Sequence, residues 1–445
     1  MTLKFKESRE SVASPMMLWG ETPTQISIED VYDIKVYPVT TIINEGAINF
    51  DIPSQPKGML ANIDIVTKFK VKKGEANLVE ADNVTLINNF ANSLWELCDI
   101  KLADRVDITQ SLRNAYGYAS FFSNCLNSDA NREDYLFATQ GFLMDSGKTK
   151  TESETLVFTG DGVKNEAASR RAKRIKKSKS ITVTAPLHAP LFNTAKCLPT
   201  RMKIRVSLTK NSDKFLLMGD DPDYTVILED VHLIVRYLKP RDMFLNLIEE
   251  RLLKDPAVFF LSRPEIIVRP ITQQSRVIRL NHLFLGRLPK HAFFVLQKSS
   301  DFDGTLSSSP YNFIPFSKFQ IHIDGVGYFP ESLSIDFTNE TEGRIYDDNW
   351  SYLQQLYRTI GRDMKGTSLI NSKNFQLNFM VGLSLTSDRS PTNVGYLNCQ
   401  GDSSSMVEID LGYDQNIAED LVLIIYSVYD QVIKIDGERN IQLID

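Results

Sequence analysis

Cysteine is scarce in this sequence, because its 445 residues include only four and none of them has a CxxC spacing. So few cysteines, placed so far apart, neither staple a chain of this size nor match a zinc-binding pattern. We therefore expect buried thiols in a reducing compartment at Cys98, Cys125, Cys197 and Cys399.

Long apolar runs are also missing. No stretch approaches the ~18 apolar residues of a membrane span, and residues 1–21 lack the apolar core of a signal peptide. We expect a protein that is made in the cytosol and is not inserted in a membrane.

The sequence also lacks an excess of positive charge. The chain has 50 Lys and Arg against 56 Asp and Glu, for a formal net charge of −6. A general nucleic-acid coat would be basic over a whole face, so any contact with nucleic acid must be local. A hydrophobic content of 42% predicts a folded chain, and its length exceeds what a single hydrophobic core usually serves.

Catalytic signatures are missing as well. The sequence has no Walker A loop, HExxH, GxSxG or zinc-deaminase pattern. Residues 301–304 (Asp-Phe-Asp-Gly) lack the further carboxylates of a calcium loop, and Asp220, Asp221 and Asp223 read as a solvated turn. The histidines are scattered among predicted strands: His188, His232, His282, His291 and His322. We expect no enzyme activity, no cofactor and no metal.

The sequence is rich in alternating strands. Within residues 62–71, Ile63, Ile65 and Phe69 share one face with Val71, and Lys68 lies on the other, as expected for a half-buried antiparallel strand. Residues 201–209 alternate in the same way. Further strands are predicted at 224–238, 264–271, 276–285, 291–297, 375–385, 406–413, 421–429 and 431–435. Asp324-Gly325 between two alternating runs predicts a hairpin.

Helices are few, and the clearest are predicted at residues 111–127, 242–254 and 348–360, the last with Asp348 as its N-cap. The helix at 242–254 ends before Asp255-Pro256 and separates two strand-rich halves. Two such halves predict a pair of sandwiches or barrels, although no residue-by-residue repeat relates them. Polar loops are predicted at 143–170, 219–223, 301–310 and 386–404.

Several segments resemble, in collinear order over nearly the whole chain, the double jelly-roll major capsid proteins of double-stranded DNA viruses. The similarity is greatest to those of Polinton (Maverick) elements and adintoviruses, and weaker to those of virophages and large nucleocytoplasmic viruses. The segments are 22–42, 48–53, 86–102, 180–217, 231–240 and 284–337, the last with motifs at 285–289, 302–304, 310–313 and 323–325. The chain departs from the family at residues 309–313, where Asn usually precedes the Pro, and near Pro190, where an Asp is common.

The resemblance implies an all-β fold of two tandem eight-stranded jelly rolls with a few short helices in loops. The implied parts are an extended arm (1–40), a first jelly roll (41–240), a connecting helix (241–256) and a second jelly roll (257–445). The implied function is a major capsid protein whose homotrimeric, pseudo-hexameric capsomers tile an icosahedral shell around a double-stranded DNA genome. A β-sandwich carbohydrate-binding or receptor-binding module is the alternative.

The implied partners are further copies of the chain, penton and other minor capsid proteins, and packaged DNA through a local contact. The implied location is the virion capsid, after synthesis in the host cytoplasm, with the nucleus as a candidate place of assembly.

A basic run at residues 170–179 is the candidate for that DNA contact: Arg170, Arg171, Lys173, Arg174, Lys176, Lys177 and Lys179. Two interpretations stay open. One is a connector that is solvated or pairs with acidic patches on neighbours, and the other is a lumen-facing patch that contacts packaged DNA or an anionic inner layer and whose binding weakens with salt. Neutralising the first six of these residues should leave the trimer intact.

Large aromatic residues are candidate inter-subunit anchors. Tyr311, Phe313 and Phe316 follow a polar loop, and Trp19 lies in the arm. The alternatives are core aromatics beneath a surface loop and an arm that folds back on its own base.

Overall fold

The structure is a computed structural model, in which strands dominate and helices are short. It describes residues 24–40, 46–104, 106–109, 114–145, 165–271, 277–284, 287–334, 351–361, 368–371, 374–391, 405–411 and 420–444. No helix in these ranges is long and apolar enough to cross a membrane.

The first half of the chain forms two facing antiparallel sheets. One has the order β1-β11-β3-β8, and the other has the order β2-β9-β6-β7. Their bounds are β1 (Ile28–Val36), β2 (Ala47–Ile52), β3 (Met59–Lys73), β6 (Trp95–Leu102), β7 (Val106–Asp107), β8 (Ile181–Pro186), β9 (Ile204–Lys210) and β11 (Tyr224–Pro240). The short strand β4 (Ala76–Asn77) extends the first sheet, and β5 (Val84–Leu86) pairs with β10 (Leu217–Gly219).

The second half forms two further antiparallel sheets, with the orders β12-β20-β14-β18 and β13-β19-β15-β16. Their bounds are β12 (Ala257–Ile271), β13 (Val277–Asn281), β14 (His291–Lys298), β15 (Lys318–Ile323), β16 (Val326–Gly327), β18 (Val381–Ser384), β19 (Ser405–Asp410) and β20 (Leu421–Ile435). β17 (Leu333–Ser334) pairs with β15, and β21 (Ile441–Ile444) pairs with β20.

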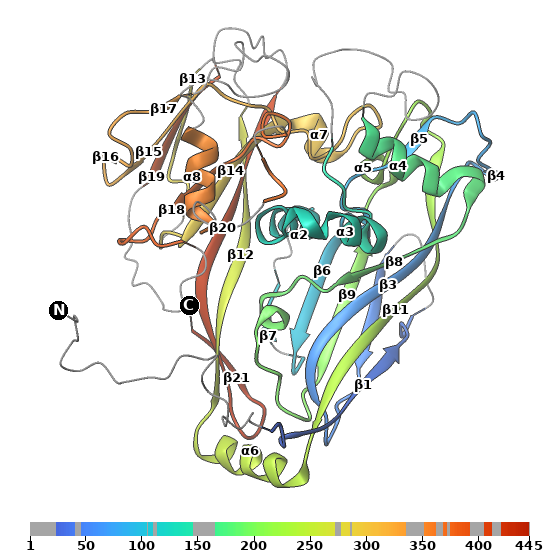
Figure 1. Ribbon diagram of the computed structural model, residues 1–445, viewed down its shortest axis with the longest axis vertical. Coiled ribbons are helices and arrows are strands. Elements are labelled where there is room, and N and C mark those ends of the chain that lie inside the picture. Colours follow the sequence, from blue (N-terminus) through green and yellow to red (C-terminus); the bar gives the residue numbers. More distant parts are fainter. Residues whose placement is uncertain are drawn as a thin grey trace, which may run out of the picture.

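The two halves have the same topology. When the eight principal strands of each half are numbered along the chain, both halves follow the orders 1-8-3-6 and 2-7-4-5. This double Greek key is a jelly roll, so the predicted pair of eight-stranded jelly rolls is confirmed. Figure 1 shows the two jelly rolls side by side, with α6 (Asp242–Lys254) joining them at one end.

The first strand lies within the segment predicted to be an arm (1–40). β1 pairs with β11 from Ile28 opposite Pro240 to Val36 opposite Leu233. Because this pairing runs along the whole of β1, Ile28–Val36 is a sheet strand and not part of an arm. The other domain boundaries stay predictions.

Alternation places the core as the sequence indicates. In β3, Ile63, Ile65 and Phe69 are buried while Lys68 is exposed. The predicted hairpin is confirmed, because Asp324 (φ 50°) and Gly325 (φ 80°) form the left-handed turn between β15 and β16.

The strand predicted at 375–385 is largely wrong, since only Val381–Ser384 is a strand. Phe375 and Phe379 are both buried, and the backbone N–H and the side-chain amide of Asn378 each donate to the Asn374 carbonyl at 3.1 Å. A helical turn therefore buries both rings. The four-residue spacing of Phe375 and Phe379 fits such a turn as well as it fits one face of a strand.

Three helices connect β7 to β8, namely α2 (Ala115–Asn127), α3 (Glu133–Gln140) and α4 (Glu166–Ile175). In Figure 1, α2 lies between the two jelly rolls, and α3 lies next to it over the first jelly roll. Predicted helix 348–360 corresponds to α8 (Ser351–Thr359), and Asp348 lies outside the described residues. The remaining helices are α1 (Phe90–Ser93), α5 (Asp213–Leu216) and α7 (Ser299–Asp303).

Candidate functional site

The basic run is not a solvated connector. It forms most of α4 and a following 3-10 turn (Lys176–Ser178). The helix begins inside the predicted loop 143–170 and extends beyond its end. The Asn165 side chain caps α4 by accepting the Ala168 N–H at 3.1 Å, and Glu166 lies in the first turn. The buried positions of the helix recur at helical spacing: Ala168, Arg171, Ala172 and Ile175.

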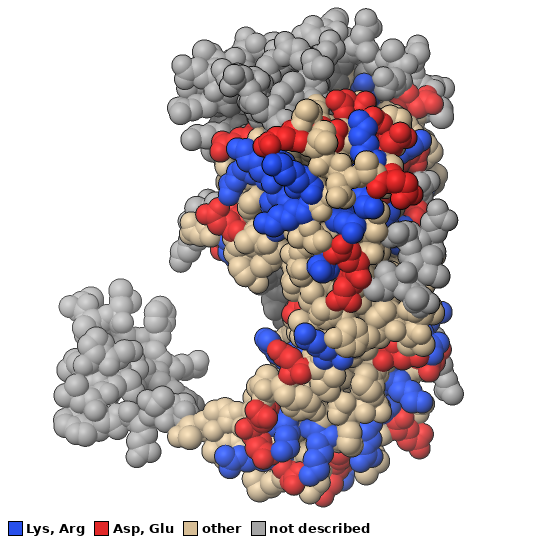
Figure 2. Space-filling view, turned by 90° about the vertical axis from the view of Figure 1, so that its right-hand side faces the viewer, with Lys and Arg blue, Asp and Glu red and all other residues tan. Residues whose placement is uncertain are grey.

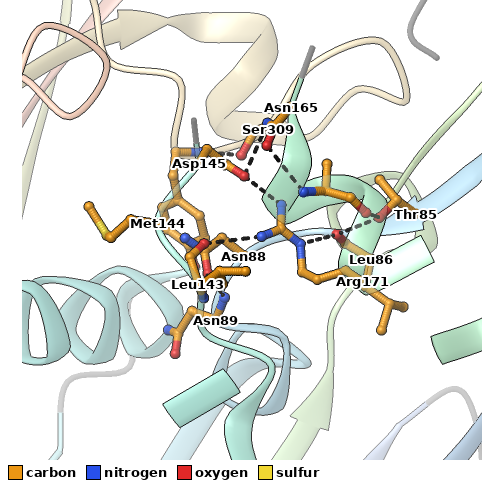
Figure 3. Close-up of polar contacts among 12 residues, drawn as sticks. Thr85, Leu86, Asn88, Asn89, Leu143, Met144, Asp145, Asn165, Arg171 and Ser309 are labelled. Atoms are coloured by element: carbon orange, nitrogen blue, oxygen red, sulfur yellow. Dashed lines mark hydrogen bonds and ion pairs between the residues drawn. The ribbon is translucent and has the colours of Figure 1, made fainter. Parts of the chain in front are cut away.

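Arg171 is buried within this helix, with only 1% of its surface exposed. Its guanidinium donates to the Leu86 carbonyl at 2.9 Å, the Leu143 carbonyl at 3.1 Å and the Asp145 carboxylate at 2.7 Å. Figure 3 shows these groups converging on the Arg171 side chain. Including Arg171 in a surface patch was therefore wrong, because its charge is fully engaged in joining α4 to two other segments.

Other members of the run also have partners in the chain. The guanidinium groups of Arg170 and Arg174 lie 4.5 Å and 5.3 Å from the centre of the Phe137 ring on α3. Arg174 also donates to the Phe137 carbonyl at 2.8 Å, and burial lowers its pKa. Lys177 lies 3.3 Å from Glu80, and its hydrogen bond lowers the pKa of that carboxyl.

A smaller basic surface remains. Lys173, Lys177 and Lys179 are exposed, and Lys176 is half-buried. Figure 2 shows Lys and Arg side chains gathered on the upper part of the face that the first jelly roll presents. Four lysines of the run therefore remain candidates for an electrostatic contact.

The candidate anchors lie inside the chain. Tyr311, Phe313 and Phe316 are 3%, 0% and 1% exposed, so an inter-subunit role is wrong for them, and the alternative of core aromatics holds. Phe316 packs edge-on against Phe379 at 4.7 Å within the second jelly roll. Trp19 lies outside the described residues.

Tyr311 and Phe313 instead belong to an aromatic contact between the jelly rolls, the interdomain seam. It joins Tyr118, Phe121 and Phe122 of α2 to Phe302, Tyr311 and Phe313 of the loop between β14 and β15. Tyr311 stacks on Phe121 at 4.1 Å between ring centres, with 5° between their planes, and Phe313 stacks on Phe122 at 5.9 Å.

Hydrogen bonds fix the register of the interdomain seam. The Ser93 and Tyr311 hydroxyls are 2.5 Å apart, and the Tyr118 hydroxyl donates to the Pro310 carbonyl at 2.9 Å. Gly304, at φ 89°, allows the loop to approach the first jelly roll, because a Cβ there would lie 2.7 Å from Phe215 Cα. Burial raises the pKa of both tyrosines, so they stay neutral.

A second contact, the base clamp, joins the jelly rolls near α6. Arg439 donates to both Glu249 carboxylate oxygens, at 2.6 and 2.8 Å, and to the Thr200 carbonyl at 2.8 Å. Burial acts to raise the pKa of Glu249, but the hydrogen bonds from Arg439 and Thr200 outweigh it, and the pKa is lowered. The two contacts hold the jelly rolls together at separate points.

A cleft of about 560 Å³ lies between the jelly rolls, and His188 and His291 are among its lining residues. These residues come from opposite halves of the chain, so sequence spacing gave no signal that they share a site. The described residues contain no group of three or more His, Cys, Asp or Glu that could hold a metal ion. Cys98 and Cys125 are buried, and burial raises the pKa of both thiols.

The fold can now be compared with known proteins. The mavirus major capsid protein aligns over 100% of this chain and 97% of its own, with a TM-score of 0.58 and 11% identity. The faustovirus major capsid protein covers 97% of this chain and 93% of its own, with a TM-score of 0.59 and 7% identity. This chain has their double jelly-roll fold.

Two further comparisons extend this result. A chain of the Sputnik virophage structure has a TM-score of 0.60 and 10% identity, over 98% of this chain and 93% of its own. In sequence, an uncharacterized protein of Caenorhabditis elegans is 20% identical over 376 residues, which is 80% of each protein. No family model matches the chain. The resemblance drawn from the sequence is thus confirmed for the fold.

Proposed function

We propose that this chain is a major capsid protein and not an enzyme. The observation that carries the proposal is the presence of two jelly rolls of identical strand order, locked side by side within one chain. A jelly roll packs two sheets over one core and so forms a compact block. Three chains around a three-fold axis would place six similar blocks in a ring, and such a pseudo-hexamer can tile a closed shell.

The alternative, a carbohydrate-binding or receptor-binding sandwich, explains the structure less well. Such a module needs one sandwich and does not need a second of the same strand order. It also does not need the aromatic seam that fixes one sandwich against the other. The mavirus and faustovirus major capsid proteins, in contrast, align with 100% and 97% of this chain, so the alignments include both blocks.

The proposed partners follow from this role. The chain would bind two further copies of itself, then neighbouring capsomers, penton proteins and other minor capsid proteins, in a virion capsid. Synthesis in the host cytoplasm, with the nucleus as a candidate place of assembly, belongs to the same proposal. The proposed DNA contact rests on the exposed lysines of the basic run, which face solvent in the single chain.

Light scattering coupled to size-exclusion chromatography tests the proposal. We expect a particle of three times the chain mass of 50.5 kDa, unchanged over a hundredfold dilution. Electron microscopy of the same fraction should show particles with a pseudo-hexagonal outline. A stable monomer, or a particle with a two-fold outline, would contradict the capsomer.

A further inference from the structure

The cleft between the jelly rolls carries an inference that does not depend on capsid assembly. Its volume of about 560 Å³ lies within the range of small-molecule sites, roughly 300–1,000 Å³. Helix α2 and the segment after β8 form one wall, and strands β12, β14 and β20 form the other. Both jelly rolls therefore contribute to it.

Lys196 is the one charged side chain among the described residues that line the cleft, because burial lowers the pKa of His188 and His291 and keeps both rings neutral. None of the described residues that line the cleft is Asp or Glu. The Lys196 ammonium donates to the Val258 carbonyl at 2.8 Å and lies 5.8 Å from the centre of the Phe260 ring. Phe260 is 56% exposed, which places Lys196 at the mouth of the cleft. This arrangement favours an anion.

His291 supplies unused hydrogen-bonding groups in the wall of the cleft. The residue is 1% exposed, and neither ring nitrogen has a partner among the described residues. The Nε2 atom of His188, across the cleft, likewise has no partner there. A buried polar group without a partner is unfavourable, so a ligand that pairs with both rings is stabilised by these contacts.

The cleft lining also contains apolar and aromatic side chains, beside the polar Ser123, Asn127, Thr194 and Ser262. Phe259, Phe293 and Tyr426 contribute ring surfaces, together with Phe260 at the mouth and the aliphatic Leu126. Aromatic walls favour a flat ring, which stacks or packs edge-on against them. We propose that the cleft binds a small aromatic carboxylate, whose ring packs on these walls and whose carboxylate pairs with His188 and His291.

Proton uptake should accompany binding. Burial lowers the pKa of His188 to about 4 and that of His291 to about 3. Lys290 lowers the His291 pKa further, while Asp388 acts in the opposite direction, and Lys290 is itself 3.6 Å from Asp430. A bound carboxylate stabilises the protonated rings and raises both pKa values, so affinity increases as the pH falls.

Calorimetric titration of the purified chain with 3-phenylpropionate tests the proposal, with the neutral 3-phenylpropanamide as the matched probe. We expect saturable one-to-one binding of the acid, about tenfold tighter at pH 5.5 than at pH 7.5 because binding takes up protons. The amide should bind more weakly, with the same affinity at both pH values. Absence of saturable binding, or equal affinity for the two probes, overturns the proposal.

Variants identify the residues. His291→Gln and His188→Gln should each weaken binding of 3-phenylpropionate about tenfold and reduce its dependence on pH. His322→Gln, a half-buried histidine on β15 outside the cleft, should leave both unchanged. Near-ultraviolet circular dichroism reports folding, and if His291→Gln does not fold, the half-buried His188 carries the test. Wild-type binding by both cleft variants overturns the assignment. Ligand binding is measured independently of the particle mass. The binding proposal can therefore fail while the capsid proposal holds, and the reverse.

Discussion

The two jelly rolls share a strand order but differ in what fills the connection between their fifth and sixth strands. In the first, this connection carries α2, α3 and α4, and α2 forms one side of the interdomain seam. In the second, the corresponding connection carries α8, which packs on its own strand β18. The strand order builds two similar blocks, and the insertion in one of them determines how they are joined.

The insertion of the first jelly roll is also packed differently. Its helices meet over buried amides rather than over apolar side chains alone. Asn124 donates to Asn89 at 3.2 Å and to Gln140 at 3.1 Å, and Asn92 donates to the same two acceptors at 3.0 and 3.2 Å. Such directional bonds favour one arrangement of α1, α2 and α3, which in turn fixes the aromatic face of α2.

Removing an aromatic ring from the interdomain seam should have the largest effect. Tyr311→Ala removes a buried ring that stacks on Phe121, and we expect the free energy of unfolding to fall by about 3–5 kcal/mol. Tyr311→Phe keeps the ring and loses only the contact with Ser93, at a cost of about 1 kcal/mol. Urea denaturation followed by intrinsic fluorescence measures both.

The control for this prediction is Tyr135→Ala. Tyr135 is 59% exposed on α3, so its loss should change stability by less than about 0.5 kcal/mol. Equal effects at Tyr311 and Tyr135 would mean that the seam does not hold the jelly rolls together.

Truncation of Arg171 should have the next largest effect. Arg171→Ala removes the guanidinium that donates to Asp145 and to two buried carbonyls, and we expect the free energy of unfolding to fall by about 3 kcal/mol. Lys173→Ala, two residues along the same helix at an exposed position, should cost less than about 0.5 kcal/mol. Thermal unfolding with proteolysis compares the two, and a similar midpoint for both would contradict the structural role of Arg171.

The same contrast explains what the sequence could and could not predict. Most strands, α6 and the hairpin at Asp324 follow from local patterns, and the double jelly roll follows from the resemblance. Helix α4 was missed because its buried face combines alanines with Arg171, which sequence patterns count as polar. The N-cap Asn165 and the first-turn Glu166 were the available signal.

The tertiary contacts could not be predicted from the sequence, for a different reason. Aromatic residues in a loop can bury themselves in their own chain or in another, and nothing local to Tyr311 distinguishes these outcomes. The cleft joins His188 and His291 only because the jelly rolls are docked. Local patterns therefore predicted the blocks, whereas the joint between them required the structure.

Acid should lower the free energy of unfolding by less than the Tyr311→Ala and Arg171→Ala substitutions do. The folded-state pKa of His291 is about 3, below its ordinary value of 6.5, so the unfolded chain binds the proton more readily. Stability from this residue is complete above pH 6.5 and is lost as the pH falls below it, by about 2 kcal/mol at pH 5. Urea denaturation of wild type and His291→Gln between pH 7.5 and 5 measures the difference. Parallel pH profiles would mean that His291 is not held neutral by the fold.

The smallest effect on stability is expected from four lysines of the basic run, three exposed and one half-buried, in contrast to the buried Arg171 within the same run. Replacing Lys173, Lys176, Lys177 and Lys179 with Ala should leave the unfolding midpoint and the particle mass unchanged, because exposed charges contribute little. If these lysines contact packaged DNA, the variant should bind double-stranded DNA more weakly at low salt and show a shallower dependence on salt concentration.

The matched control replaces four exposed lysines of other segments: Lys35, Lys101, Lys203 and Lys318. Gel-shift titration at two salt concentrations distinguishes the sets, and equal losses in both would mean that the basic run has no special role in binding DNA.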